Sequence, residues 1–180
     1  LIFDDIYLHT TIASLDREML RAFRRAGGRH MFVGLESGSE RVRLEMGKPG
    51  GKELSNSEIL RRTAMCREEG IELGVFLIVG WPGETEVDAR DTEALVEAIA
   101  PTDIQTSVLK IYPGTALCGR AVREGRIRDE DWLDPECAFF TYVRGEELVA
   151  AQQRAQSLEE RFQTHCIRKP FESQGDRYAL

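Results

Sequence analysis

Short apolar runs alternate with longer segments of helical spacing along the 180 residues of the chain. Nearly continuous apolar runs predict buried strands, as in parallel sheets. They lie at 1–3, 30–35, 71–79 and 104–112. The intervening segments repeat apolar residues every three or four positions and predict helices. These cover 14–27, 55–70, 85–100, 115–125 and 146–166, with a short helix after residue 39. Ser14 and Ser55 are the expected N-caps of the first two helices, and Val87 is expected to face inward in the third.

Strands that alternate with helices form βα units with right-handed crossovers, so the pattern predicts an α/β fold around a parallel sheet. The sheet is either open and doubly wound or part of a barrel. In both arrangements the loops that follow the strands lie along one edge of the sheet. Because α/β proteins bind small molecules at that edge, these loops are where a site is expected.

The loop after the strand at 71–79 has the sequence Gly-Trp-Pro-Gly-Glu (80–84). Proline fixes one backbone dihedral and glycine permits conformations that other residues avoid, so the chain turns sharply here. Gly80 and Gly83 leave room for a ligand against bare backbone. A similar loop, Tyr-Pro-Gly-Thr (112–115), follows the strand at 104–112.

The loop after the strand at 30–35 contains Glu36, Ser37, Gly38 and Ser39. A carboxylate and two hydroxyls suit a polyol such as ribose, because Glu accepts hydrogen bonds from hydroxyls while Ser donates or accepts them. Helix capping is the structural alternative, since Ser39 is a good N-cap for the helix that follows. Capping accounts for one serine and leaves Glu36 unexplained.

Three further charged side chains are candidates for binding. Lys48 lies in a glycine-rich loop, where it meets an anionic group of a ligand or is simply solvated. Asp4 and Asp5 follow the strand at 1–3, where they bind a ligand or metal or cap the next helix, with capping slightly favoured. With Glu36, either aspartate would also suit an acid–base enzyme, a hypothesis that leaves the loops at 80–84 and 112–115 unexplained.

Composition is typical of a soluble globular protein of one domain's length, with 42% hydrophobic and 31% charged residues, and we expect a cytoplasmic protein. A net charge of −7 argues against nucleic acid or an anionic membrane as partner, and no stretch resembles a transmembrane helix or signal peptide. The four cysteines show no metal-binding spacing, which favours reduced, buried thiols. They are Cys66, Cys118, Cys137 and Cys166. The start inside an apolar run, without Met, suggests a fragment or a trimmed chain.

Taken in order, several phrases resemble the radical SAM superfamily, above all the subgroup that often has a cobalamin-binding domain upstream. The phrases are G-x-E-S-G-S at 34–39, M-G-K at 46–48, I-x-G-x-P-G-E-T at 78–85 and Y-P-G-T at 112–115. The resemblance covers roughly residues 4–133. It implies that 1–133 is the C-terminal part of a barrel, with about four parallel strands of a (βα)6 core, and that 134–180 is a helical extension and tail.

The resemblance also implies an enzyme that binds a [4Fe-4S] cluster and S-adenosylmethionine and forms a 5'-deoxyadenosyl radical, as an oxidoreductase or transferase. Glu36 and Ser37 would then lie near the ribose hydroxyls, with Ser39 beside them. Lys48 would approach the methionine carboxylate. The adenine pocket would be formed by Ile78, Gly80, Pro82, Gly83, Glu84 and the backbone at Tyr112.

The chain lacks the family's cluster motif, C-x-x-x-C-x-x-C, although the cluster needs three thiolates and an open iron. The interval from Asp5 to Leu15 is also short for the family. We therefore expect a C-terminal fragment that is inactive alone, with a small-molecule or unknown substrate. The alternative is a non-catalytic module that binds a nucleoside or a protein. In either case the first strand's edge should be covered by the missing half of the barrel or by a second copy.

Overall fold

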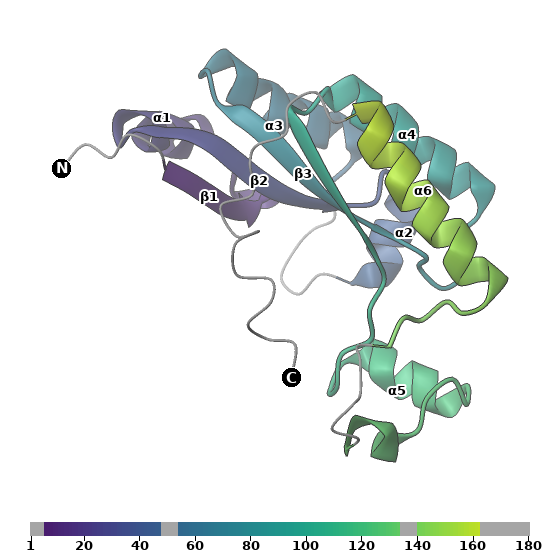
Figure 1. The fold of residues 1–180 in the computed structure, drawn as a ribbon. Helices are drawn as coiled ribbons and strands as arrows, with labels where there is room; N and C mark the ends of the chain where they lie inside the picture. The colour runs from purple at the N-terminus through teal and green to yellow at the C-terminus, as the bar shows by residue number, and fades with distance from the viewer. Residues whose placement is uncertain (1–5, 48–53, 134–139, 163–180) are drawn as a thin grey trace.

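A single parallel sheet forms the centre of the computed structural model, which describes residues 6–47, 54–133 and 140–162. Its four strands lie in the order of the sequence (Figure 1). They are β1 (Ile6–Thr11), β2 (Gly28–Glu36), β3 (Glu72–Val79) and β4 (Asp103–Val108). A doubly wound sheet reverses its strand order at one point, whereas a barrel wall does not. The predicted α/β fold is therefore confirmed in its barrel form, as an open wall.

Helices lie against one face of this sheet, and no helix of the described residues covers the other (Figure 1). The covering helices are α1 (Arg17–Arg25), α3 (Asn56–Glu68), α4 (Glu86–Ile99) and α6 (Glu146–Phe162). Two shorter helices, α2 (Glu40–Met46) and α5 (Ala116–Arg123), follow the carboxyl ends of β2 and β4. Short 3-10 helices occupy Ile12–Ser14 and Asp129–Leu133. No described helix is long and apolar enough to cross a bilayer.

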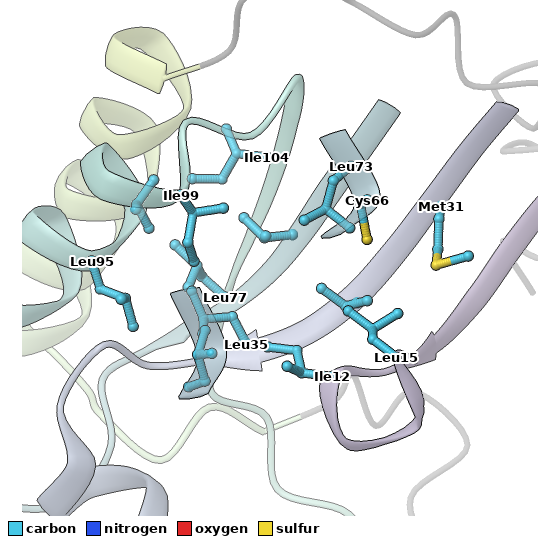
Figure 2. Close-up of a cluster of buried hydrophobic side chains, with 14 of the residues drawn as sticks. Ile12, Leu15, Met31, Leu35, Cys66, Leu73, Leu77, Leu95, Ile99 and Ile104 are labelled. Carbon is cyan, nitrogen blue, oxygen red and sulfur yellow. The ribbon is translucent and has the colours of Figure 1, made fainter. Parts of the chain in front are cut away.

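The main core lies between the sheet and its helices because alternate strand residues point to the same face. Met31 and Leu35 of β2 and Leu73 and Leu77 of β3 are all buried there (Figure 2). Helices α3, α4 and α6 complete the layer. They contribute Ile59, Met65, Cys66, Leu95, Val96, Ile99, Ala151 and Leu158.

The opposite face carries a small aromatic cluster. The ring of Phe32 lies 5.0 Å from that of Phe76 and 5.6 Å from that of His9, measured between centroids. Gly74 makes this packing possible, since a Cβ there would lie 2.3 Å from Cε1 of Phe32. Around the cluster, this face of the sheet is exposed at Tyr7 and Gln105.

A second, smaller core lies beneath α5. After β4 the chain leaves the sheet, and an antiparallel bridge joins Lys110 to Thr141. Leu109 and Ile111 are then buried in a hydrophobic cluster with Cys118, Ala121, Ile127 and Tyr142. The strand predicted over 104–112 therefore ends early, at Val108.

Several predicted details need correction. The strand predicted at 1–3 lies outside the described residues, and β1 occupies the interval that the sequence made look short. Asp16, not Ser14, caps α1, because the hydroxyl of Ser14 instead donates to the carbonyl of Thr11. Val87, predicted to face inward, is 58% exposed, and the buried stripe of α4 runs through its neighbour Asp88.

Candidate cofactor-binding rim

The carboxyl ends of β2 and β3 carry two loops that we call the ESGS loop (36–39) and the GWPGE loop (80–84). Glu36 begins the first with a φ of 65°, which is uncommon for a residue other than glycine. A register shift between Gly34 and Glu36 marks a bulge at the same point. Bulges and strained backbone are frequent beside active sites at the rims of barrels.

The rest of the ESGS loop packs tightly on α4. Ser37 Oγ lies 3.2 Å from Thr92 Oγ1, and the N–H of Gly38 donates to the same hydroxyl at 2.9 Å. A Cβ on Gly38 would lie 2.3 Å from the Cα of Thr92, so only glycine permits this approach. Arg43 of α2 donates to the carbonyl of Ser37 at 2.7 Å. These contacts fix the backbone directly after Glu36.

Asp88, at the start of α4, joins the two loops. Its Oδ1 accepts from the hydroxyl of Ser39 at 2.6 Å, while Ser39 also caps α2. Its Oδ2 accepts from the N–H of Thr85 at 2.8 Å, which completes a capping box with the Thr85 hydroxyl. The Arg41 guanidinium binds both carboxylate oxygens. Hydrogen bonds from Arg41, Ser39 and Thr85 hold the pKa of Asp88 well below its usual range, against the opposing effect of burial.

Helix α2 also holds the GWPGE loop directly. Arg41 Nη2 donates to the carbonyl of Gly83 at 2.9 Å. Glu45, one turn further along α2, accepts from Trp81 Nε1 at 3.2 Å and from Arg41 Nη1 at 2.6 Å. The ESGS loop, α2 and the GWPGE loop therefore form one hydrogen-bonded unit.

Glu84 closes the GWPGE loop on itself. Its Oε2 accepts from the N–H of Gly80 at 2.9 Å, and its own N–H donates to the carbonyl of Trp81 at 2.9 Å. The Glu84 side chain is only 6% exposed, and Arg154 Nη1 of α6 lies 3.4 Å from the same Oε2. Burial raises the pKa of Glu84, whereas the Gly80 N–H and the charge of Arg154 oppose that rise.

A cavity of about 340 Å³ lies between the GWPGE loop, α6 and the second core. All five loop residues line it, together with Arg154 and Glu147 of α6. On it lie Arg120 and Arg126, whose guanidinium groups are 5.7 Å and 4.5 Å from the ring centroid of Tyr142. Both arginines bind Glu124, which also accepts from the Tyr142 hydroxyl. These three donors, the hydroxyl first, lower the pKa of Glu124 to about 2.

The predicted binding residues are thus distributed over different surroundings. Gly80, Pro82, Gly83 and Glu84 line the cavity, whereas the hydroxyls of Ser37 and Ser39 are buried and hydrogen-bonded within the protein. Ile78 packs against the second core, and Tyr112 is 49% exposed. Lys48, Asp4 and Asp5 lie outside the described residues.

Sequence reasoning missed the residues that connect the loops. Asp88 had a readable signal, because Thr85 and Asp88 have the spacing of a capping box. Arg41 and Glu45 likewise have the four-residue spacing of a helical ion pair. Arg154 had no local signal, since its partner Glu84 is 70 residues away in the sequence.

The described residues do not fit an iron–sulfur cluster. Cys66 and Cys118 lie in the two separate cores, and no group of three potential metal-binding side chains occurs in the described segments. Burial raises the pKa of the Cys66 thiol to about 11, so it is protonated at neutral pH. Ligands for a cluster would have to come from outside the described part of the chain.

Comparison with known proteins identifies the family. The model of the radical SAM superfamily matches residues 4–96. A tRNA-2-methylthio-N(6)-dimethylallyladenosine synthase from Geotalea uraniireducens is 33% identical over 98 residues, which are 54% of this chain and 22% of that protein. A putative methylthiotransferase from Methanocaldococcus jannaschii is 29% identical over 104 residues, or 58% of this chain and 22% of its own length. The matches thus span about a fifth of these relatives.

Solved structures show the same fold. The radical S-adenosylmethionine methyltransferase TsrM from Kitasatospora setae, with cobalamin and a [4Fe-4S] cluster bound, gives a TM-score of 0.60 at 23% identity. That match covers 67% of this chain and 23% of TsrM. Coproporphyrinogen III oxidase from Escherichia coli, a radical SAM enzyme, gives a TM-score of 0.61 at 16% identity and covers 87% of this chain and 32% of its own. With more than half of its length matched by the family model, the chain belongs to the radical SAM superfamily.

Proposed function

We propose that this chain is part of a radical SAM enzyme and that its rim binds the adenosyl portion of S-adenosylmethionine. The observation that supports this most is the backbone of Glu36, held at positive φ on a bulge at the end of β2. Such strain persists only where surrounding contacts enforce it, at a cost of about 1–3 kcal/mol. Here the contacts of Ser37 and Gly38 with Thr92 of α4 enforce it, which indicates that the direction of the Glu36 side chain matters for function.

In this proposal Glu36 accepts hydrogen bonds from the ribose hydroxyls. Ser37 and Ser39 act one step away, because their hydroxyls are already engaged with Thr92 and Asp88. They hold the ESGS loop in place instead of binding the ribose themselves. Ser37 and Ser39, which the family resemblance placed beside the cofactor, therefore have a structural role in this proposal.

The adenine would lie between the loops that follow β3 and β4. Gly83 and Gly114 both have positive φ, and a Cβ on either would meet nothing within 4 Å, so a planar ligand can approach their backbone. Ile78 and Tyr112 would add apolar contact on either side. Lys48 stays a predicted partner for the methionine carboxylate.

S-adenosylmethionine, reduced at a [4Fe-4S] cluster, would supply the 5'-deoxyadenosyl radical. The thiolates of the cluster would belong to a part of the protein outside this chain, because the chain contains no C-x-x-x-C-x-x-C triplet. We also propose that this part pairs with β1, which bonds to β2 alone at the edge of the described sheet. A second copy in that position is the alternative, and a cobalamin domain upstream stays a prediction.

The absent triplet favours a second candidate, a cluster-free module that binds a nucleoside or a protein. The natural full-length protein, purified without oxygen and reconstituted with iron and sulfide, separates the two. A radical SAM enzyme would be brown and would form 5'-deoxyadenosine after reduction with dithionite, measured by liquid chromatography. A colourless protein that forms none would contradict the enzyme proposal and support the module.

The ribose assignment is tested by Glu36→Gln in the same protein. A hydrogen bond to a charged group contributes about 1.5–3 kcal/mol, so the dissociation constant for S-adenosylmethionine should rise about 10- to 150-fold. Equilibrium dialysis measures it. Glu93→Gln on the surface of α4 is the control and should leave binding within about twofold. Equal binding by Glu36→Gln and the control would refute the assignment.

A further inference from the structure

Helix α6 contacts the GWPGE loop although it lies outside the residues that match the family model, 4–96. The contact is made by Arg154, whose guanidinium bridges two carboxylates. Nη1 lies 3.4 Å from Glu84 Oε2 and Nη2 lies 2.8 Å from Glu86 Oε1. Arg154 is 26% exposed and Glu84 only 6%, so the pair with Glu84 is better shielded from solvent than most surface ion pairs, whereas Glu86 is 78% exposed.

The position of Arg154 is set by a helix that is itself fixed to the barrel wall. Ala151 and Leu158, on either side of it, are buried in the main core. Glu159 accepts a hydrogen bond at 2.6 Å from the N–H of Thr106 in β4. The guanidinium is therefore presented to the loop from a rigid support.

Arg154 acts on the atom that closes the loop. Oε2 of Glu84 accepts from the N–H of Gly80 at 2.9 Å and faces the guanidinium at the same time. Gly80 has a φ of 81°, and a Cβ there would lie 3.1 Å from Val143 Cγ2 in the segment that leads into α6. The turn at Gly80 is thus held by Glu84 within the loop and by contacts with Arg154 and Val143 outside it.

We propose that Arg154 is a positioning residue that holds the GWPGE loop in its cofactor-binding conformation, so that α6 sets the affinity for S-adenosylmethionine. This rests on the proposed function, because it takes the loop to be part of the adenosyl site. Arg154 itself touches Glu84 and Glu86 and acts on the cofactor only through the loop.

The role has a pH signature. Ionised Glu84 is the stronger acceptor for the Gly80 N–H, so cofactor binding should weaken as pH falls through the pKa of Glu84. Because the charge of Arg154 opposes the rise of that pKa, its removal should move the weakening to higher pH. The other charged groups around Glu84 stay unchanged. They are Arg41 from α2, Glu86 and Asp88 from α4, Glu147 from α6, and Arg120 and Arg126 along the cavity.

The test uses Arg154→Met in the reconstituted natural full-length protein, with Arg154→Lys as the charge-conserving variant. Arg161→Met is the matched control, because Arg161 lies on the same helix and pairs with Glu93 and Glu97 on the surface of α4. Hydrogen exchange of the Gly80 amide reports on the loop. Equilibrium dialysis at several pH values gives the dissociation constant for S-adenosylmethionine and the midpoint of its weakening in acid.

Arg154→Met should make exchange of the Gly80 amide about tenfold faster and raise the dissociation constant for S-adenosylmethionine about tenfold. It should also move the pH midpoint of the weakening in acid to a higher pH. Arg154→Lys should restore the midpoint toward wild type, and Arg161→Met should match wild type within about twofold. If wild type binds S-adenosylmethionine and Arg154→Met behaves like Arg161→Met, the positioning role is refuted while the proposed function stands. If wild type binds none, the proposed function fails, and the inference about affinity fails with it.

Discussion

Replacing Asp88 by Asn tests whether one buried carboxylate holds the two loops of the rim together. The side chain of Asp88 is 6% exposed and accepts from Ser39, Arg41 and Thr85. An amide keeps the shape and retains one acceptor. The orientation that keeps the most donors places the oxygen toward Thr85 and the Arg41 Nη2, and turns the NH2 group toward Ser39 and the Arg41 Nε.

The magnitude follows from the bonds that this orientation loses. A hydrogen bond to a charged group contributes about 1.5–3 kcal/mol. In this orientation the amide loses the bond from Arg41 Nε and the ionic part of the bond from Arg41 Nη2, while the Ser39 hydroxyl can rotate to accept. Arg41 is about half exposed, so water replaces part of the loss. We expect local destabilisation of about 2–3 kcal/mol, which corresponds to exchange that is roughly 30- to 160-fold faster.

The assay is hydrogen exchange of the natural full-length protein, followed in peptides that cover 36–42 and 83–92. The amides of Gly38 and Thr85 should lose protection, whereas those in the middle of α3 should not. Glu93→Gln is the matched control on α4, because its ion pair with Arg161 is exposed and should contribute less than about 0.5 kcal/mol. If Asp88→Asn stays within about twofold of this control, or if all peptides accelerate equally, the carboxylate does not join the loops.

Two other substitutions or modifications are informative. Gly38→Ala should destabilise the protein by about 3 kcal/mol, because its Cβ would meet the backbone of Thr92. Gly83→Ala should cost only roughly 1–2 kcal/mol, the strain of an alanine in the left-handed conformation. The melting temperatures of the two variants measure this difference, and equal losses would refute the close approach of Gly38 to α4. The raised pKa of Cys66 predicts alkylation by iodoacetamide at about pH 8 that is roughly 100-fold slower than for the unfolded chain, measured by mass spectrometry. Rapid labelling of the native protein would show that Cys66 is not buried as described.

Local patterns predicted those parts of the fold that local physics determines. Helices bury one face of β2 and β3, and the other face carries the aromatic cluster, so the apolar runs of these strands are nearly continuous and easy to recognise. The N-caps at Ser39 and Ser55 were predicted because capping depends on residues three positions apart. By contrast, β1 alternates between half-buried and exposed residues at a sheet edge, and the sequence Ile-Tyr-Leu-His-Thr-Thr was not recognised as a strand.

The errors at the site arise where tertiary contacts override local preference. In α4 an apolar criterion chose Val87 as an inward residue, yet the helix turns Asp88 inward because the carboxylate finds Arg41, Ser39 and Thr85 there. A buried charge is stable only when its partners are in place, and two of these partners lie more than 40 residues away in the sequence. No periodicity within α4 contains that information.

The two loops are held by contacts from different parts of the chain. The ESGS loop is held by α2 and α4, both within the residues that match the family model, 4–96. The GWPGE loop is held by α2 on one side and by Arg154 of α6, beyond that match, on the other. The first set of contacts can therefore be shared by members of the family, whereas the second depends on a segment outside the matched core. If Arg154 positions the loop as we propose, cofactor affinity is adjustable through α6 without any change in the residues that touch the cofactor.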